Sequence, residues 1–266
     1  MSASTLAVLA ALALAPEQQG GLKLENVRGT HGLQGPVRTE KKLLPGDSVY
    51  VCFDIEGITV SPDGKVKYSI ATEITDAKGK SVYKQEPRDL EVPLSLGGNR
   101  VPGFSQIDCG LEQPPGKYTL KLTVTDRAAN KSATFTHDFE IAERGFGLVR
   151  FSTTRDKDGL VPSNVPGVGE MLWLQFGVVG FERDKAGKQP SVAVELQVLD
   201  GDGKPVGKPQ SGVINKDVPD NVAALPLQFW LSLNRPGKFT LVVTATDQLT
   251  KKTTKTTLPF TVVELK

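Results

Sequence analysis

An internal repeat constrains this chain more than any other feature. Pro-Gly pairs at residues 45–46 and 166–167 stand 166 − 45 = 121 residues apart. The same interval separates residues 115–120, PGKYTL, from residues 236–241, PGKFTL. A period of this length indicates that one structural unit is written twice along the chain. With 266 residues in all, each copy is long enough to bury a core of its own.

We therefore expect two domains, residues 21–143 and residues 144–266, joined by a short linker around Glu143. The 27 Gly and 18 Pro residues separate short β-branched and alternating runs, and no helical period is sustained after Gly20. This pattern predicts an all-β fold of two tandem antiparallel sandwiches. The expected strands are residues 22–27, 48–56, 66–76, 81–85, 101–111, 117–126 and 134–142, and then 147–153, 170–180, 192–200, 224–233, 238–247 and 254–264.

The N-terminus carries an apolar run over residues 6–15, which is too short to cross a bilayer. It is typical of a signal peptide for export, with Ala13 and Ala15 in the small-x-small cleavage pattern, although no Lys or Arg precedes it. The alternative is an apolar helix that stays attached. We expect residues 1–20 to be signal and tail, the protein to be exported, and no membrane span to remain after signal removal.

The repeated segment at residues 115–126 and 236–247 resembles the penultimate strand of the immunoglobulin-like and fibronectin type III-like modules found in tandem in exported bacterial proteins. The resemblance covers nearly everything from Gly21 onward. It implies that Tyr118 occupies the tyrosine-corner position, where the hydroxyl bonds back to the backbone. Phe239 stands at the equivalent position and has no hydroxyl. These motifs specify a fold and no activity.

The two cysteines, Cys52 and Cys109, lie in expected neighbouring strands, and an even count in an exported protein favours a disulfide. Side-chain alternation places Cys52 away from the core. With an ungapped repeat Cys109 also faces outward and a bridge can form. With one extra residue in the turn at residues 114–116, Cys109 faces inward, and the two thiols stay separate, one buried and one exposed.

The repeat aligns these cysteines with the two tryptophans, Trp173 and Trp230. Alternation places both indoles on the outer face of adjacent strands, where they could stack on sugar rings or contact a protein. The alternative is that the first domain, the linker or an N-terminal strand covers them.

No combination of residues predicts catalysis, a cofactor or a metal. The two histidines, His31 and His137, have no partner at metal-ligand spacing, and the turn at residues 200–204 has too few ligands for a calcium loop. Scattered basic residues and a net charge of +2 argue against nucleic acid as a partner. We expect a non-catalytic structural, adhesion or protein-interaction module at the cell envelope, or alternatively a carbohydrate-binding module that uses Trp173 and Trp230.

Overall fold

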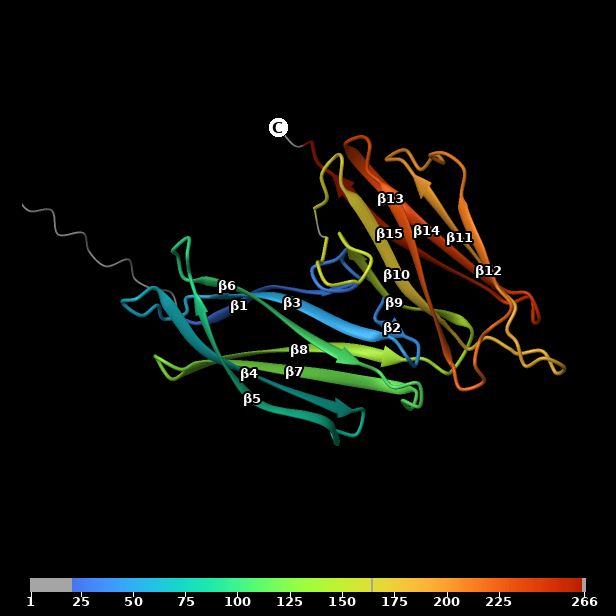
Figure 1. Ribbon diagram of the computed structural model, residues 1–266. Helices are drawn as coiled ribbons and strands as arrows, with labels where there is room; N and C mark the ends of the chain where they lie inside the picture. Colours follow the sequence, from blue (N-terminus) through green and yellow to red (C-terminus); the bar gives the residue numbers. More distant parts are fainter. Residues whose placement is uncertain (1–20, 164, 265–266) are drawn as a thin grey trace, which may run out of the picture.

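The computed structural model describes residues 21–163 and 165–264, and these residues contain strands and turns but no helix. The predicted signal segment, residues 1–20, lies outside the described residues. Two sandwiches, one built from β1–β8 and one from β9–β15, lie at an angle to each other (Figure 1). We call them the N-terminal and C-terminal sandwiches. The all-β fold class is confirmed, while the boundary at residues 143–144 stays a prediction.

The N-terminal sandwich packs a three-stranded sheet against a five-stranded sheet. The pairing is antiparallel except for the short parallel contact between β2 and β8. The first sheet has the order β1 (Lys23–Thr30), β3 (Ser48–Glu56), β6 (Arg100–Asp108), and the second has the order β2 (Lys42–Leu43), β8 (Lys131–Ile141), β7 (Gly116–Asp126), β4 (Lys65–Asp76), β5 (Ser81–Pro93).

The C-terminal sandwich repeats this plan with a three-stranded and a four-stranded sheet, both antiparallel. The first has the order β13 (Ala224–Ser232), β10 (Met171–Val179), β9 (Gly147–Thr154), and the second has the order β12 (Gln210–Ile214), β11 (Val192–Leu199), β14 (Gly237–Asp247), β15 (Thr253–Val262). Besides the two-residue strand β2, two features were not predicted. β5 continues to Pro93 instead of ending at Gln85, and β12 is an additional edge strand.

Each sandwich has its own hydrophobic core, filled by the alternating residues of facing strands. In β3 the inward set includes Val51, Phe53 and Ile55, which are almost fully buried. In β10 Leu172 and Leu174 play the same part. Full burial of one such side chain contributes about 2 kcal/mol, so the period-2 pattern accounts for why each copy of the repeat closes over its own interior.

The repeat also preserves a buried carboxylate that ties a loop to the end of a strand. Asp126, the last residue of β7, accepts hydrogen bonds from the N–H groups of Thr59 (2.8 Å) and Ala128 (2.9 Å). Asp247, the last residue of β14, accepts one from the N–H of Glu182 (3.1 Å). Burial acts to raise the pKa of both carboxyls, but the backbone donors hold each pKa below its usual value. Both residues are therefore structural.

Candidate functional site

A carboxylate of the N-terminal sandwich binds the backbone of the C-terminal sandwich. Asp47 is 3% exposed. Its Oδ1 accepts hydrogen bonds from the N–H of Ser48 (2.8 Å) and from the N–H of Arg150 (2.7 Å), and its Oδ2 accepts one from Arg38 Nη2 (2.7 Å). The Arg150 Nε also donates to the carbonyl of Gly46 (2.7 Å). We call these five residues, Arg38, Gly46, Asp47, Ser48 and Arg150, the joint.

A β-bulge in β9 makes the N–H of Arg150 available to the joint. The register between β9 and β10 shifts where Gln175 and Gly177 pair with Ser152 and Val149. Arg150 lies in the extra segment with a φ of 56°, which is unusual for a residue with a side chain. Such a bulge turns one backbone group out of the ladder, so that it can bind elsewhere.

The loop after β1 packs against the same strand. The His31 ring meets the Phe151 ring edge-on at 5.9 Å. Gly32 has a φ of 74°, and a Cβ there would lie 2.8 Å from the Cβ of Ser152, so only glycine fits. Burial first, and the nearby Arg38 guanidinium second, lower the pKa of His31 to about 4. His31 is therefore a neutral packing residue between the sandwiches, and sequence spacing gave no sign of that role.

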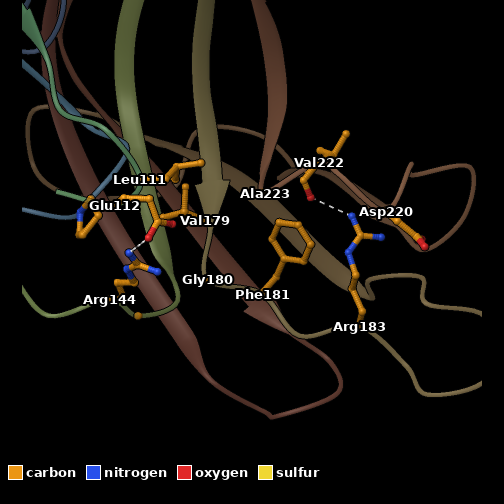
Figure 2. A pocket seen from close by; sticks show the side chains of 12 residues that line it. Leu111, Glu112, Arg144, Val179, Gly180, Phe181, Arg183, Asp220, Val222 and Ala223 are labelled. Carbon is orange, nitrogen blue, oxygen red and sulfur yellow. Dashed lines mark hydrogen bonds and ion pairs between the residues drawn. The ribbon is translucent and has the colours of Figure 1, made fainter.

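On another side of the linker, a pocket of about 310 Å³ lies between the two sandwiches (Figure 2). Its arginines are already engaged. Arg144 pairs with Glu112, and Arg183 donates to the carbonyls of residues 188, 218, 219 and 222. Phe181 lies near the Arg183 guanidinium, which is 5.5 Å from its ring centre. The polar groups of this pocket thus hold the loops together.

The predicted disulfide is not formed, because both cysteines are free and buried. Cys52 pairs in register with Phe104, whereas the N–H of Cys109 bonds to the carbonyl of Asp47 (2.8 Å). Cys109 therefore lies beside a residue that precedes Cys52 by five positions. Five residues of extended chain span roughly 17 Å, so the two cysteines are much farther apart than the Cα atoms of a disulfide. Cys109 faces the core, as in the gapped alignment. The expectation of one exposed thiol is also wrong, since Cys52 lies on the opposite face beneath Thr30, whose Oγ1 is 3.5 Å from its Sγ.

The two tryptophans lie directly opposite each other. Trp173 of β10 pairs in register with Trp230 of β13. Trp230 is 51% exposed, and Trp173 is half-buried. The Trp230 carbonyl accepts a hydrogen bond from Gln210 Nε2 (3.0 Å), which ties β12 to this edge. The pair therefore presents apolar surface on the outer face of the three-stranded sheet.

A groove of about 580 Å³ lies on the same outer face, next to the tryptophan pair. We call it the outer groove. The groove was not predicted, although the lack of a side chain at Gly177 within an alternating strand is a signal for it. Its lining consists of Val149, Arg150, Ser152, Gln175, Phe176, Gly177, Ala224, Pro226, Leu227 and Gln228.

The other sequence predictions were that the chain has no metal site, that residues 200–204 form a turn and not a calcium loop, and that no membrane span remains. Within the described residues, no cluster of three His, Cys, Asp or Glu side chains is arranged to hold a metal ion. Asp200 accepts hydrogen bonds from the N–H groups of Asp202 (3.0 Å) and Lys204 (2.9 Å), which is a turn. His137, one of the two histidines without a metal-ligand partner, has its pKa lowered mainly by burial and secondly by the charge of Lys41. No helix in the described part of the chain has the length and apolar character needed to span a membrane.

Comparison with known proteins gives weak likenesses only. No family model matches the chain, and no curated protein does. The C-terminal domain of the Streptococcus pyogenes antigen I/II-family protein AspA is 10% identical, over 91% of this chain and 99% of that one, with a TM-score of 0.32. Dimeric latent PorU from Porphyromonas gingivalis is 12% identical, over 95% of this chain and 21% of that one, with a TM-score of 0.37.

The chain spans less than a third of a further similar structure, the Pseudomonas fluorescens alkylpurine DNA glycosylase AlkC bound to DNA containing an abasic site analog. That likeness covers 46% of this chain and 30% of the other, at 13% identity and a TM-score of 0.30. Likenesses of this strength carry no inference about what this chain does. Its function has to be argued from its own residues.

Proposed function

We propose that this chain is a non-catalytic structural or adhesion module, in which two domains are held at a fixed angle to present surfaces to a protein or polysaccharide partner at the cell envelope. The observation that carries this proposal is the joint. Asp47 binds Arg150 of the other sandwich in a buried setting, where hydrogen bonds to a charged group are worth about 1.5–3 kcal/mol each. A flexible linker would need no such contact.

The proposal includes the division at residues 143–144 and the immunoglobulin-like or fibronectin type III-like kind of both domains. Support for the kind comes from the Tyr118 hydroxyl, which donates to the carbonyl of Pro114 (2.8 Å) in the manner of a tyrosine corner. In the C-terminal sandwich the guanidinium of Arg235 lies 5.2 Å from the ring centre of Phe239 instead. Export, directed by residues 1–20, belongs to the same proposal.

Small-angle X-ray scattering of the protein in solution tests the fixed angle. A single rigid arrangement of the two sandwiches should reproduce the curve at both low and high salt, because the joint is buried and therefore weakly screened. A curve that requires an ensemble of angles would overturn the proposal. Fractionation of cells that express the full chain with a C-terminal tag tests export separately, and retention in the cytoplasm would contradict it.

A second candidate function, carbohydrate binding, is favoured by one observation, the exposure of Trp230 beside Trp173 on a sheet face. Indole faces stack on the apolar faces of sugar rings. Screening of soluble polysaccharides by affinity electrophoresis, with Trp230→Ala as the variant, tests this function. Phe104→Ala is a matched control, because Phe104 is a strand residue of the N-terminal sandwich with 48% exposure. Equal retardation of wild type and Trp230→Ala would rule it out.

A further inference from the structure

The outer face of β9, β10 and β13 is organised in successive rows across the strands. Trp173 lies opposite Trp230, and the next outward pair is Gln175 opposite Gln228. The third pair is Gly177 opposite Pro226, where the absence of a long side chain leaves the outer groove open. Two steps of two residues each separate the first row from the third, which is roughly 14 Å along the strands.

The amide row provides free hydrogen-bonding groups. Gln175 Nε2 donates to the carbonyl of Lys157 (2.9 Å), which fixes the orientation of that half-buried amide, and its Oε1 lies beside Gly159 with no hydrogen bond in the described residues. Gln228 is exposed, and its side chain forms no hydrogen bond within the described residues. The two side chains together offer acceptors and donors, which is what neighbouring hydroxyl groups of a sugar require.

Among the described residues, Arg150 is the one charged residue that lines the outer groove. No carboxylate in the described part of the chain forms an ion pair with its guanidinium. The Asp47 carboxylate lies beside Arg150, since it accepts a hydrogen bond from the Arg150 N–H, and it offsets part of the positive charge. The groove therefore carries no strong net charge that would select a polyanion, while Arg150 retains N–H groups to donate to hydroxyl oxygens.

We propose that the tryptophan pair and the outer groove form one elongated site for a neutral polysaccharide. Trp230 and Trp173 stack on one sugar ring, and the amides of Gln175 and Gln228 bind the hydroxyls of the following rings above Gly177. This inference rests on the second candidate function, carbohydrate binding. Alternation of an aromatic row with an amide row suits a sugar chain better than a protein partner, which needs a continuous apolar patch at its centre.

Isothermal titration calorimetry with neutral oligosaccharides of increasing length, taken from a polysaccharide that retards the protein, tests the extent of the site. We expect affinity to increase with length and then reach a plateau. Trp230→Ala should weaken binding of every length by about tenfold or more, which corresponds to about 1.4 kcal/mol. Gln228→Ala should weaken binding of the long oligosaccharides only, by several-fold. Gln85→Ala, at an exposed position of β5 in the N-terminal sandwich, is the matched control and should change nothing.

The possible failures are distinguishable. If no polysaccharide binds the wild type, carbohydrate binding itself is wrong and the groove site with it. If Trp230→Ala abolishes binding but Gln228→Ala and oligosaccharide length have no effect, the tryptophans act alone and the elongated site is refuted. Tighter binding of acidic than of neutral oligosaccharides would overturn the assignment to a neutral chain. Dimerisation in sedimentation experiments that Trp230→Ala removes would assign this face to a second copy instead.

Discussion

The joint makes a quantitative prediction about Asp47→Ala. The substitution removes the acceptor of three hydrogen bonds and leaves the Arg38 guanidinium without its carboxylate. Loss of one partner of a fully buried ion pair costs about 3–5 kcal/mol. The Arg38 side chain is 17% exposed and regains some hydration, which lowers that cost. We expect a loss of about 3 kcal/mol in the free energy of unfolding of the N-terminal sandwich, or a Tm lower by about 10 °C.

Differential scanning calorimetry and small-angle scattering measure the two consequences of this substitution. The unfolding transition of the N-terminal sandwich should move to a lower temperature. The scattering curve should no longer fit a single angle between the sandwiches, because the Arg150 N–H has lost its acceptor in the other sandwich. Asp202→Ala is the control, since Asp202 is exposed in a turn, and its effect should stay within about 0.5 kcal/mol. A double-mutant cycle with Arg38→Met should show that the second substitution costs much less once Asp47 is gone. Unchanged stability and unchanged scattering in Asp47→Ala would refute the reasoning.

Other predictions concern thiols, the tyrosine corner and pH. Thiol titration should find two thiols after denaturation without reductant and almost none in the native protein, because Cys52 and Cys109 are buried and burial raises the pKa of Cys109 to about 12; a denatured protein without thiols would contradict this. Tyr118→Phe should lower the free energy of unfolding by about 1 kcal/mol through loss of the bond to the Pro114 carbonyl, as chemical denaturation can measure. Stability should decrease as pH is lowered from about 6.5 to about 4, because the unfolded state protonates His31 while the folded state keeps it neutral; urea titrations of His31→Gln, which should show a smaller decrease with the His137 contribution retained, provide the check.

Local alternation was enough to predict most of the fold. The inward residues of β3 and β10 follow a period of two, and the repeat interval places the same strand at equivalent positions of both halves. Strand prediction failed where few side chains pack against the core, because burial is what produces the alternation of apolar and polar residues. β5 lies at an edge, and its residues from Ser81 to Asp89 are all exposed, so no alternation marks the strand until Leu90 and Val92, and Pro87 interrupts the polar run before them.

The disulfide between Cys52 and Cys109 was predicted wrongly because side-chain alternation gives only the face on which a residue lies. It does not give the register between two paired strands. Adding one residue to a turn reverses the face of every residue that follows. Cys109 lies one residue beyond the end of β6, where the chain turns and its side chain enters the core. The distance between Cys109 and Cys52 depends on the pairing of β6 with β3, which no spacing within one strand specifies.

The joint and the outer groove were beyond sequence analysis for a shared physical reason. Both depend on the bulge at Arg150, a left-handed backbone conformation that the residue type does not announce. The corresponding strand of the first sandwich, β1, also has a bulge, which contains Asn26, whose side chain donates to Asp54 (2.7 Å) within its own sheet. A bulge with a left-handed residue thus occurs in the first strand of both sandwiches, at positions that differ by two residues along the partner strand. In the second copy its N–H instead binds the first sandwich, while its side chain lines the outer groove, so any ligand held near Arg150 would contact the element that fixes the angle between the domains.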